Sequence, residues 1–186
     1  MKRITLALLF GFFVIIPAIK AQTKSAMDPM SPDDCTIGFG IGPGIPVWGN
    51  GSGFGPAAKF TFEKGMWQIG PGVLTLGGEA TFSFFSHHYG NNWREAWMNF
   101  IFGARSAYHY GWNVRGLDTY AGIPLGIGFT TYSHANYPGY TNYFPVYPYV
   151  GIFFGASYYF NRKLGVNAEF GYNSTYTNIG LIYKLN

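Results

Sequence analysis

Apolar and polar side chains alternate with a period of two residues along most of this chain. In LTLGGEATFSFF, residues 74–85, the even positions are apolar or small, and the odd positions through Ser83 are small or polar and include Glu79. This period predicts a β-strand with two chemically different faces. Seven further segments show the pattern, and turn signals rich in Gly, Pro, Asn or Asp separate them. We therefore expect an all-β fold with eight strands.

Composition indicates which face of these strands meets the interior. Only 11% of the 186 residues are charged, against about a quarter in typical soluble domains, whereas 48% are hydrophobic and 20% aromatic. So few charges would not cover the surface of a soluble domain. Beyond the N-terminal stretch there is no run of about 20 apolar residues that could form a transmembrane helix. Together these features predict an antiparallel up-and-down transmembrane β-barrel, with apolar side chains outward and polar side chains in the lumen.

The N-terminus has the order expected of an export signal. MKRITLALLFGFFVIIPAIKAQ begins with two basic residues, continues with an apolar stretch and ends with the small residue Ala21. We expect residues 1–21 to be a signal peptide, 22–34 a flexible segment and 35–186 the barrel. A helical anchor is the alternative, but the apolar part is short for a membrane span. Cleavage would remove three basic residues and lower the formal charge from +4 to +1, so the basic pI does not indicate nucleic-acid binding.

Strand parity sends eight charged or titratable side chains into the lumen: Lys59, Glu63, Glu79, Arg105, His109, Asp118, Glu169 and Lys184. The interior of an eight-stranded barrel is just wide enough for side chains to fill it. Buried charges need partners, and this set contains both signs. Because Glu79, Arg105 and Glu169 lie near the middle of their strands, we expect a cluster at mid-height, with Lys59 and His109 as further members.

Tryptophans provide a second test of a membrane barrel. All five lie at or near the ends of predicted strands: Trp48, Trp67, Trp93, Trp97 and Trp112. Tryptophan favours the boundary between membrane and water, where one end of its ring system is apolar and the other wet. We therefore predict aromatic girdles at these five positions, as opposed to tryptophans scattered through a core.

Four segments resemble strands of the small outer-membrane β-barrel family of Gram-negative bacteria, which includes the OmpA-, OmpX- and OmpW-like barrels. They are QIGPGVLTLGGEATFSFF, ARSAYHY, LDTYAGIPLGIGF and NIGLIYKLN, and the resemblance covers residues 35–186. It implies an integral outer-membrane protein that contacts outer-membrane lipids and is inserted by the barrel-assembly machinery. An even strand number places both mature termini at one end of the barrel, which in such proteins is periplasmic.

Three functions are open at this point. We favour a structural or surface-binding barrel with a filled lumen, whose Tyr- and Asn-rich loop SHANYPGYTNYFP would contact an extracellular ligand. A narrow, porin-like channel for small or hydrophobic solutes is the alternative, since many inward positions are glycine. A lipid-modifying enzyme is the third, with Ser86, His87 and His88 as its only tempting groups. No acidic residue in that loop could orient a base for catalysis. Metal binding by His87 and His88 is also poor, because adjacent residues on a strand point in opposite directions. We therefore expect no catalytic residues, metal or cofactor.

Overall fold

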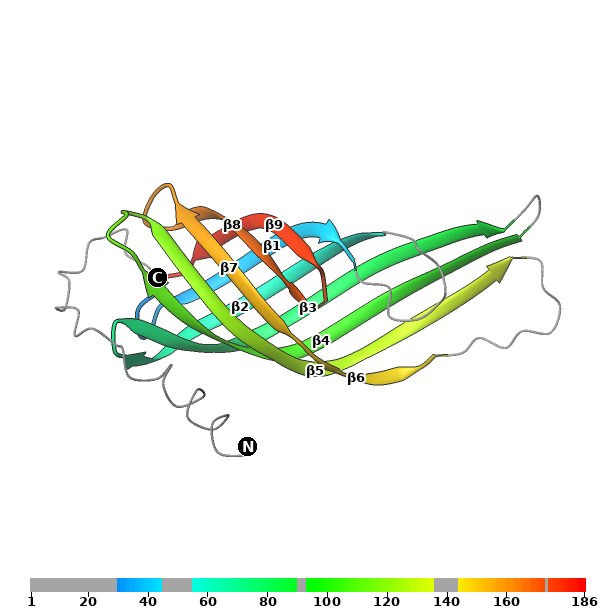
Figure 1. The fold of residues 1–186 in the computed structure, drawn as a ribbon, viewed down its shortest axis with the longest axis horizontal. Coiled ribbons are helices and arrows are strands. Elements are labelled where there is room, and N and C mark those ends of the chain that lie inside the picture. The colour runs from blue at the N-terminus through cyan, green and yellow to red at the C-terminus, as the bar shows by residue number, and fades with distance from the viewer. Residues whose placement is uncertain (1–29, 45–54, 90–92, 136–143, 173) are drawn as a thin grey trace, which may run out of the picture.

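The structure is a computed structural model that describes residues 30–44, 55–89, 93–135, 144–172 and 174–186, with side chains not described at 87–89, 93–95 and 132–135. The predicted signal peptide, residues 1–21, lies outside the described residues. The strands are β1 (Cys35–Pro43), β2 (Pro56–Ile69), β3 (Gly72–Tyr89), β4 (Trp93–Gly111), β5 (Leu117–Ala135), β6 (Val146–Val150), β7 (Ile152–Tyr159), β8 (Leu164–Tyr172) and β9 (Thr177–Lys184) (Figure 1).

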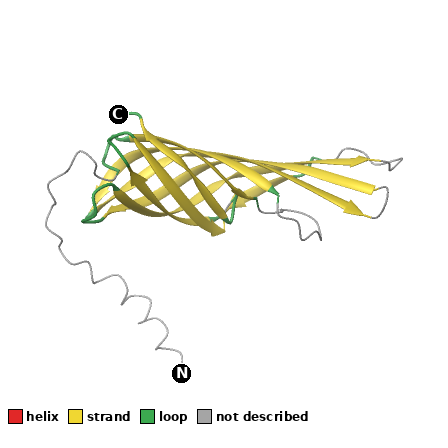
Figure 2. Cartoon of the chain, turned by 90° about the horizontal axis from the view of Figure 1, so that it is seen from above, coloured by secondary structure: helices red, strands yellow, loops and turns green. Residues whose placement is uncertain are grey.

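These strands form one closed antiparallel sheet. Strands that follow one another in the chain pair, except that β6 and β7 both pair with β5, and the β9–β1 and β4–β5 ladders complete the ring. In Figure 2 the strands of the near and far walls cross at an angle, as the tilted strands of a barrel do. Closure pairs the strands of the ring on both sides, except for β6, which pairs with β5 alone. Such pairing satisfies backbone groups without water. The predicted eight-stranded up-and-down barrel is therefore confirmed.

Nine strand segments make eight positions in the ring because β6 and β7 are two parts of one strand. Both pair with β5: β6 with Leu125–Phe129, and β7 with Leu117–Gly122. Between these two ladders lies Pro124, which has no backbone N–H to donate. The chain crosses this gap at Gly151, whose N–H donates to the Pro124 carbonyl at 3.2 Å. Because β5 lacks a backbone N–H donor at Pro124, the strand that pairs with it is interrupted there and forms β6 and β7.

The two ends of the barrel differ in their connections. At one end, which we call the turn end, the connections are residues 70–71, 112–116 and 160–163, and β1 begins and β9 ends there (Figure 1, left). The tightest is 70–71, where Gly70 adopts a positive φ of 58° that favours glycine. At the 160–163 turn, the Asn161 side chain accepts hydrogen bonds from the N–H groups of Lys163 and Leu164, both at 2.8 Å.

Three strands extend far beyond the others at the opposite end, which we call the loop end. The β2–β3 ladder stops at Ala57 and Ser83, but β3 and β4 remain paired as far as Tyr89 and Trp93. Pairing of β4 with β5 likewise continues to Ala135. We predicted loops at SHHYGNNW and from Ser133 onward. Instead, β3 continues to Tyr89, β4 begins at Trp93, and β5 continues to Ala135. The result is a three-stranded ribbon that projects from the barrel (Figure 1, right).

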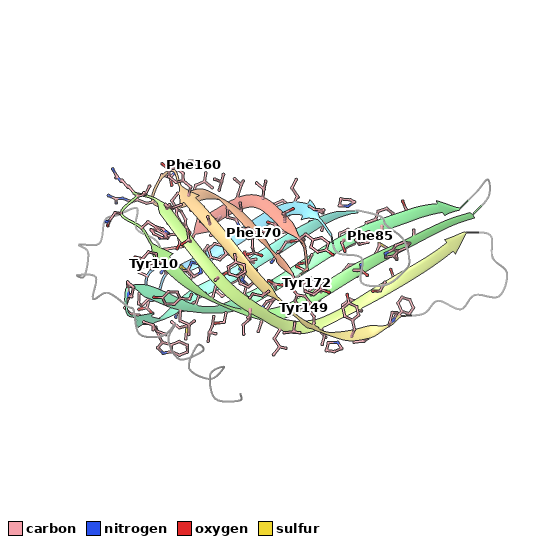
Figure 3. The ribbon with its side chains drawn as sticks, viewed as in Figure 1. Phe85, Tyr110, Tyr149, Phe160, Phe170 and Tyr172 are labelled. Atoms are coloured by element: carbon pink, nitrogen blue, oxygen red, sulfur yellow. The ribbon has the colours of Figure 1, made fainter. Side chains whose placement is uncertain are left out.

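Alternation of side chains follows the predicted parity. Large apolar residues point outward and are exposed on every strand of the ring, as at Phe39, Phe60, Leu125 and Ile179. Figure 3 labels another exposed residue, Phe170 on β8. The intervening residues point inward, and the buried ones are mainly polar, charged or aromatic. The protein's packed interior is thus polar and its surface apolar. Among the described residues, no helix is both long and apolar enough to span a membrane.

Candidate functional site: a charge cluster in the lumen

Five strands of the ring bring charged side chains together inside the barrel. Lys59 and Glu63 come from β2, Glu79 from β3, Arg105 and His109 from β4, Asp118 from β5 and Glu169 from β8. All seven are buried. Their strand positions explain this placement, because each occupies the parity that points into the lumen. The structure therefore brings together the five residues predicted for the cluster and adds Glu63 and Asp118, which the same parity also directed inward.

Arg105 lies at the centre of the cluster and faces three carboxylates. Its Nε lies 2.7 Å from Oε1 of Glu63, its Nη1 3.2 Å from Oε2 of Glu79, and its Nη2 2.8 Å from Oε2 of Glu169. Three strands hold these carboxylates at fixed positions around one planar guanidinium. A guanidinium carries five N–H donors in one plane, so a single arginine can bond to several carboxylates at once.

Lys59 joins two of the same carboxylates from the other side. Its Nζ lies 3.2 Å from Oε2 of Glu79 and also contacts Oε1 of Glu169. Glu79 and Glu169 are therefore each shared by two cations. Sharing lets each buried carboxylate satisfy more than one lone pair, which offsets the desolvation cost of charge in a closed interior.

His109 extends the cluster toward the turn end. Its Nε2 lies 2.8 Å from Oε2 of Glu63, and its Nδ1 lies 2.8 Å from Oδ2 of Asp118. Both ring nitrogens of His109 are therefore within hydrogen-bond distance of a carboxylate. Glu63 thus links His109 to Arg105, and one connected network runs from Asp118 to Lys59.

Uncharged neighbours complete the network, and sequence reasoning missed most of them. The Tyr149 hydroxyl donates to Oε1 of Glu79 at 3.0 Å, and the Thr75 hydroxyl donates to Oε2 of Glu63 at 2.6 Å. The Phe153 ring lies beneath Arg105, with the guanidinium carbon 4.1 Å from the ring centroid. Thr75 and Phe153 had inward parity that could have identified them. Tyr149, two residues before Gly151 in YVGIFFGASYYF, had the same inward parity.

The turn end of the lumen is covered by the residues before β1. Met30 and Ser31 are buried, and the N–H of Asp33 donates to the Gly65 carbonyl at 3.0 Å. The side chain of Asn186 accepts from the Cys35 N–H at 2.8 Å and donates to the Asp33 carbonyl at 2.9 Å. We expected residues 22–34 to be flexible, but residues 30–34 are held across this end of the barrel.

The predicted tryptophans fall into three groups. Trp67 and Trp112 are exposed at the turn end, by 51% and 52%, as the girdle hypothesis requires. Trp48 and the side chain of Trp93 lie outside the described residues. Trp97 differs from the prediction: it is only 6% exposed and stacks on Phe85, with ring centroids 5.9 Å apart. Because β4 starts at Trp93, Trp97 is not at a strand end, and its odd position directs it inward.

Ser86, His87 and His88, the residues considered for catalysis, lie on β3. The side chains of His87 and His88 lie outside the described residues, and Ser86 is exposed on the ribbon. Within the described ranges, no group of three or more His, Cys, Asp or Glu side chains is arranged to hold a metal ion. The lumen cluster holds buried charges of both signs in one connected set of ion pairs.

A comparison with protein-family models found no match, and a comparison with curated proteins found none either. Among solved structures, the chain is similar to Ail, the attachment invasion locus protein of Yersinia pestis, with a TM-score of 0.48, 9% identity and coverage of 83% of this chain and 96% of that one. It is also similar to Neisserial surface protein A, with a TM-score of 0.49, 12% identity and coverage of 82% and 91%. The eight-stranded closure itself is established by the strand pairings of this chain.

Replacing Arg105 tests the connectivity of the cluster. Arg105→Met should lower the free energy of unfolding by about 3–5 kcal/mol, because it leaves buried carboxylates short of a cation. Adding Glu63→Gln should recover part of this loss, since His109 keeps Asp118, and Lys59 keeps Glu79 and Glu169. Urea titration of the refolded barrel measures both variants.

The matched control is Lys64→Met, which removes an exposed cation next to Glu63 on β2. It should change the free energy of unfolding by no more than about 0.5 kcal/mol. Strictly additive losses from Arg105→Met and Glu63→Gln would show that the two residues are not coupled.

Proposed function

We propose that this chain is an integral outer-membrane barrel with a closed lumen, and that it serves a structural or surface-binding role. The observation that supports this most directly is the inversion of its two faces. On β5, Ile123, Leu125 and Ile127 are exposed by 61%, 66% and 53%, while the charges of the cluster are buried. An apolar surface that surrounds a polar interior is what a lipid environment requires.

The apolar surface is too extensive to be a local binding patch for another protein. Exposed large apolar side chains occur on every strand of the ring, so the band encircles the barrel. Soluble monomers rarely expose contiguous apolar patches of more than a few hundred Å². Within the described strand residues, Lys64 is the charged side chain on the outward face, and it lies near the turn end. Lipid chains would therefore meet a nearly uncharged belt.

The packed lumen favours a structural role over a channel. Inward glycines were the reason to consider a channel, but neighbouring side chains fill the space above several of them. A Cβ at Gly40 would collide with Asn178, one at Gly128 with Tyr147, and one at Gly155 with Tyr120. The glycines thus make room for large polar and aromatic side chains, and the charge cluster lies across the same interior.

The projecting ribbon supports the surface-binding part of the proposal. Beyond the last β2–β3 pair at Ser83, β3 continues for six residues, which corresponds to about 20 Å of extended chain. We infer that the loop end faces outward and that the turn end, with both termini, faces the periplasm. Short periplasmic turns and longer outer extensions are the usual asymmetry of such barrels. Contacts with an extracellular ligand, outer-membrane lipids and the barrel-assembly machinery belong to this proposal.

Two phenylalanines of one segment test the membrane location. Phe154 is exposed within β7, where it pairs with Ala121 of β5. Phe160 follows β7 at the turn end, where Figure 3 labels it. Phe154→Arg should cost about 2–4 kcal/mol in lipid vesicles, and Phe160→Arg about 0–1 kcal/mol, because the penalty falls with distance from the bilayer midplane. Reversible unfolding from vesicles measures both. Equal penalties at the two depths would argue against a spanning barrel.

Conductance tests whether the lumen is closed. The wild-type protein in a planar bilayer should be nearly silent, because the charge cluster and its packed neighbours fill the interior. Replacing Glu79, Arg105 and Glu169 together by Ala should produce steady ion current. Phe82→Ala, which removes a large side chain from the outward face of β3, serves as the control and should stay silent. Steady current through the wild type would instead favour the channel alternative.

Orientation can be tested by cysteine labelling, since the chain has a single cysteine. In a Cys35→Ser background, Ser86→Cys places a thiol on the exposed ribbon, and Arg162→Cys places one at the turn end, where the side chain is also exposed. A bulky membrane-impermeant maleimide added to intact cells should label the first and spare the second. Both should react after the cells are broken. The reverse pattern would invert the proposed orientation.

A further inference from the structure

Two turns at the turn end carry basic side chains but no acidic ones. Residues 112–116 connect β4 to β5, and residues 160–163 connect β7 to β8. Together they contain Arg115, Arg162 and Lys163 and neither Asp nor Glu. All three basic residues are exposed. The ion pairs found among the described residues involve none of the three.

A backbone hydrogen bond joins these two turns, although they are far apart in the sequence. The Tyr159 N–H donates to the Gly116 carbonyl at 2.8 Å. Arg115 directly precedes Gly116, and Arg162 follows Tyr159 by three residues. The turns are therefore neighbours around the ring (Figure 1). We call Arg115, Arg162 and Lys163 the basic patch.

The backbone of both turns is held by local hydrogen bonds. The Leu117 N–H donates to the Val114 carbonyl at 3.1 Å, and the Lys163 N–H donates to the Asn161 side chain at 2.8 Å. The Lys163 ammonium also donates to the Leu185 carbonyl at 3.4 Å. Lys163 is thus partly engaged within the protein, and the two arginines are the cations of the patch that are available to a partner.

Aromatic side chains in the same turns indicate the depth of the patch in a membrane. Trp112 and Phe160 are exposed by 52% and 56%, and Figure 3 labels Phe160 at this end. Exposed aromatic residues at strand ends favour the boundary between the apolar core of a bilayer and its headgroups. Arg115 follows Trp112 by three residues, and Arg162 follows Phe160 by two. Both arginines therefore lie at the level of the headgroups.

Acidic side chains at the turn end belong mainly to the segment before β1, which pairs with β2 and β9. Oδ1 of Asp33 lies 3.9 Å from Nζ of Lys64, and Oδ2 of Asp34 lies 3.6 Å from Nζ of Lys184. Asp118 is close to the first turn in sequence, but it is only 1% exposed and faces the lumen. Over the described part of the chain, the β5–β7–β8 side of this end is therefore positively charged at its surface.

We propose that the basic patch binds the phosphate groups of anionic phospholipids in the membrane leaflet at the turn end. The proposal rests on the proposed function, because it requires a barrel that spans the membrane. Arginine binds phosphate through charge-assisted hydrogen bonds, and basic residues beside a membrane are attracted to anionic lipids. A leaflet presents many phosphates in one layer, so the cations need only lie at one level and need not converge on one atom. An acidic protein would match the charges but not the exposed aromatic residues beside them.

Lipid preference tests the proposal on the full-length barrel. The protein is reconstituted in vesicles that contain equal amounts of phosphatidylglycerol and phosphatidylcholine, and native mass spectrometry identifies the lipids that it retains. Retained phosphatidylglycerol should exceed phosphatidylcholine about fivefold, which is the gain from roughly one basic residue near an anionic surface. This preference should decrease as NaCl is added, because salt screens exposed charges. Both leaflets of these vesicles have the same composition, so the result does not depend on orientation.

A double substitution assigns the preference to the basic patch. Arg115→Gln combined with Arg162→Gln removes both charges but keeps polar side chains, and the ratio of the two retained lipids should fall to about one. Lys64→Gln is the matched control. It removes an exposed cation at the same end of the barrel that is already close to Asp33, and it should leave the lipid ratio unchanged. These side chains are exposed, so we expect both variants to fold.

Three results would overturn the proposal. Equal retention of the two lipids by a wild type that folds in neutral vesicles would exclude the lipid site but leave the spanning barrel intact, whereas failure to fold in any vesicle would contradict the proposed function itself. An unchanged lipid ratio in the double variant would assign the preference to other cations. Binding of a poly-glutamate peptide without any lipid preference would make the patch a surface for acidic proteins. If the double variant does not refold, each single substitution should lower the ratio, and an unchanged ratio in both would exclude the site.

Discussion

Closure of the sheet is the constraint on which the rest of this molecule depends. Once β4 pairs with β5 and β9 with β1, every inward side chain must be accommodated in a space only wide enough for side chains. The inward positions include Lys59, Arg105 and four acidic residues, so closure forces charges into a shared interior. Each can be buried only because strands distant in sequence supply partners. The ion pairs are therefore a consequence of closure, and they also stabilise it, since each joins different strands across the lumen.

The same constraint explains why the outside is so poor in charge. Every strand must place one residue in two inside, and the charged residues of the described strands almost all take that parity. This leaves the outward face to Phe, Ile, Leu, Val and Tyr. A soluble protein would need the opposite assignment, because its surface must be wet and its core dry. The low charged fraction of the chain is thus the compositional consequence of having a polar core and an apolar exterior.

Much of this arrangement could be predicted from alternation alone, because a period of two residues fixes which face each side chain takes. The inward position of Glu79 follows directly from its neighbours in LTLGGEATFSFF. Strand lengths could not be predicted in this way. Turn-forming residues in SHHYGNNW indicated a loop, but pairing between β3 and β4 extends into that segment and overrides local preference. Trp97 was misplaced for the same reason, since its role depended on where β4 begins.

Contacts between particular atoms could not be predicted from the sequence either. Parity placed Glu63 and Asp118 inside the barrel, but only the stagger between strands shows that His109 lies between them. Stagger is set by ladder register around the whole ring, which no single strand encodes. The two ends of the barrel also differ because of this register. At the turn end, residues 30–34 are held by backbone hydrogen bonds and by the side chain of Asn186, whereas the loop end continues into the ribbon. The charge cluster lies in the lumen between these two ends, so the register of the ladders fixes both the ion pairs and the difference between the ends.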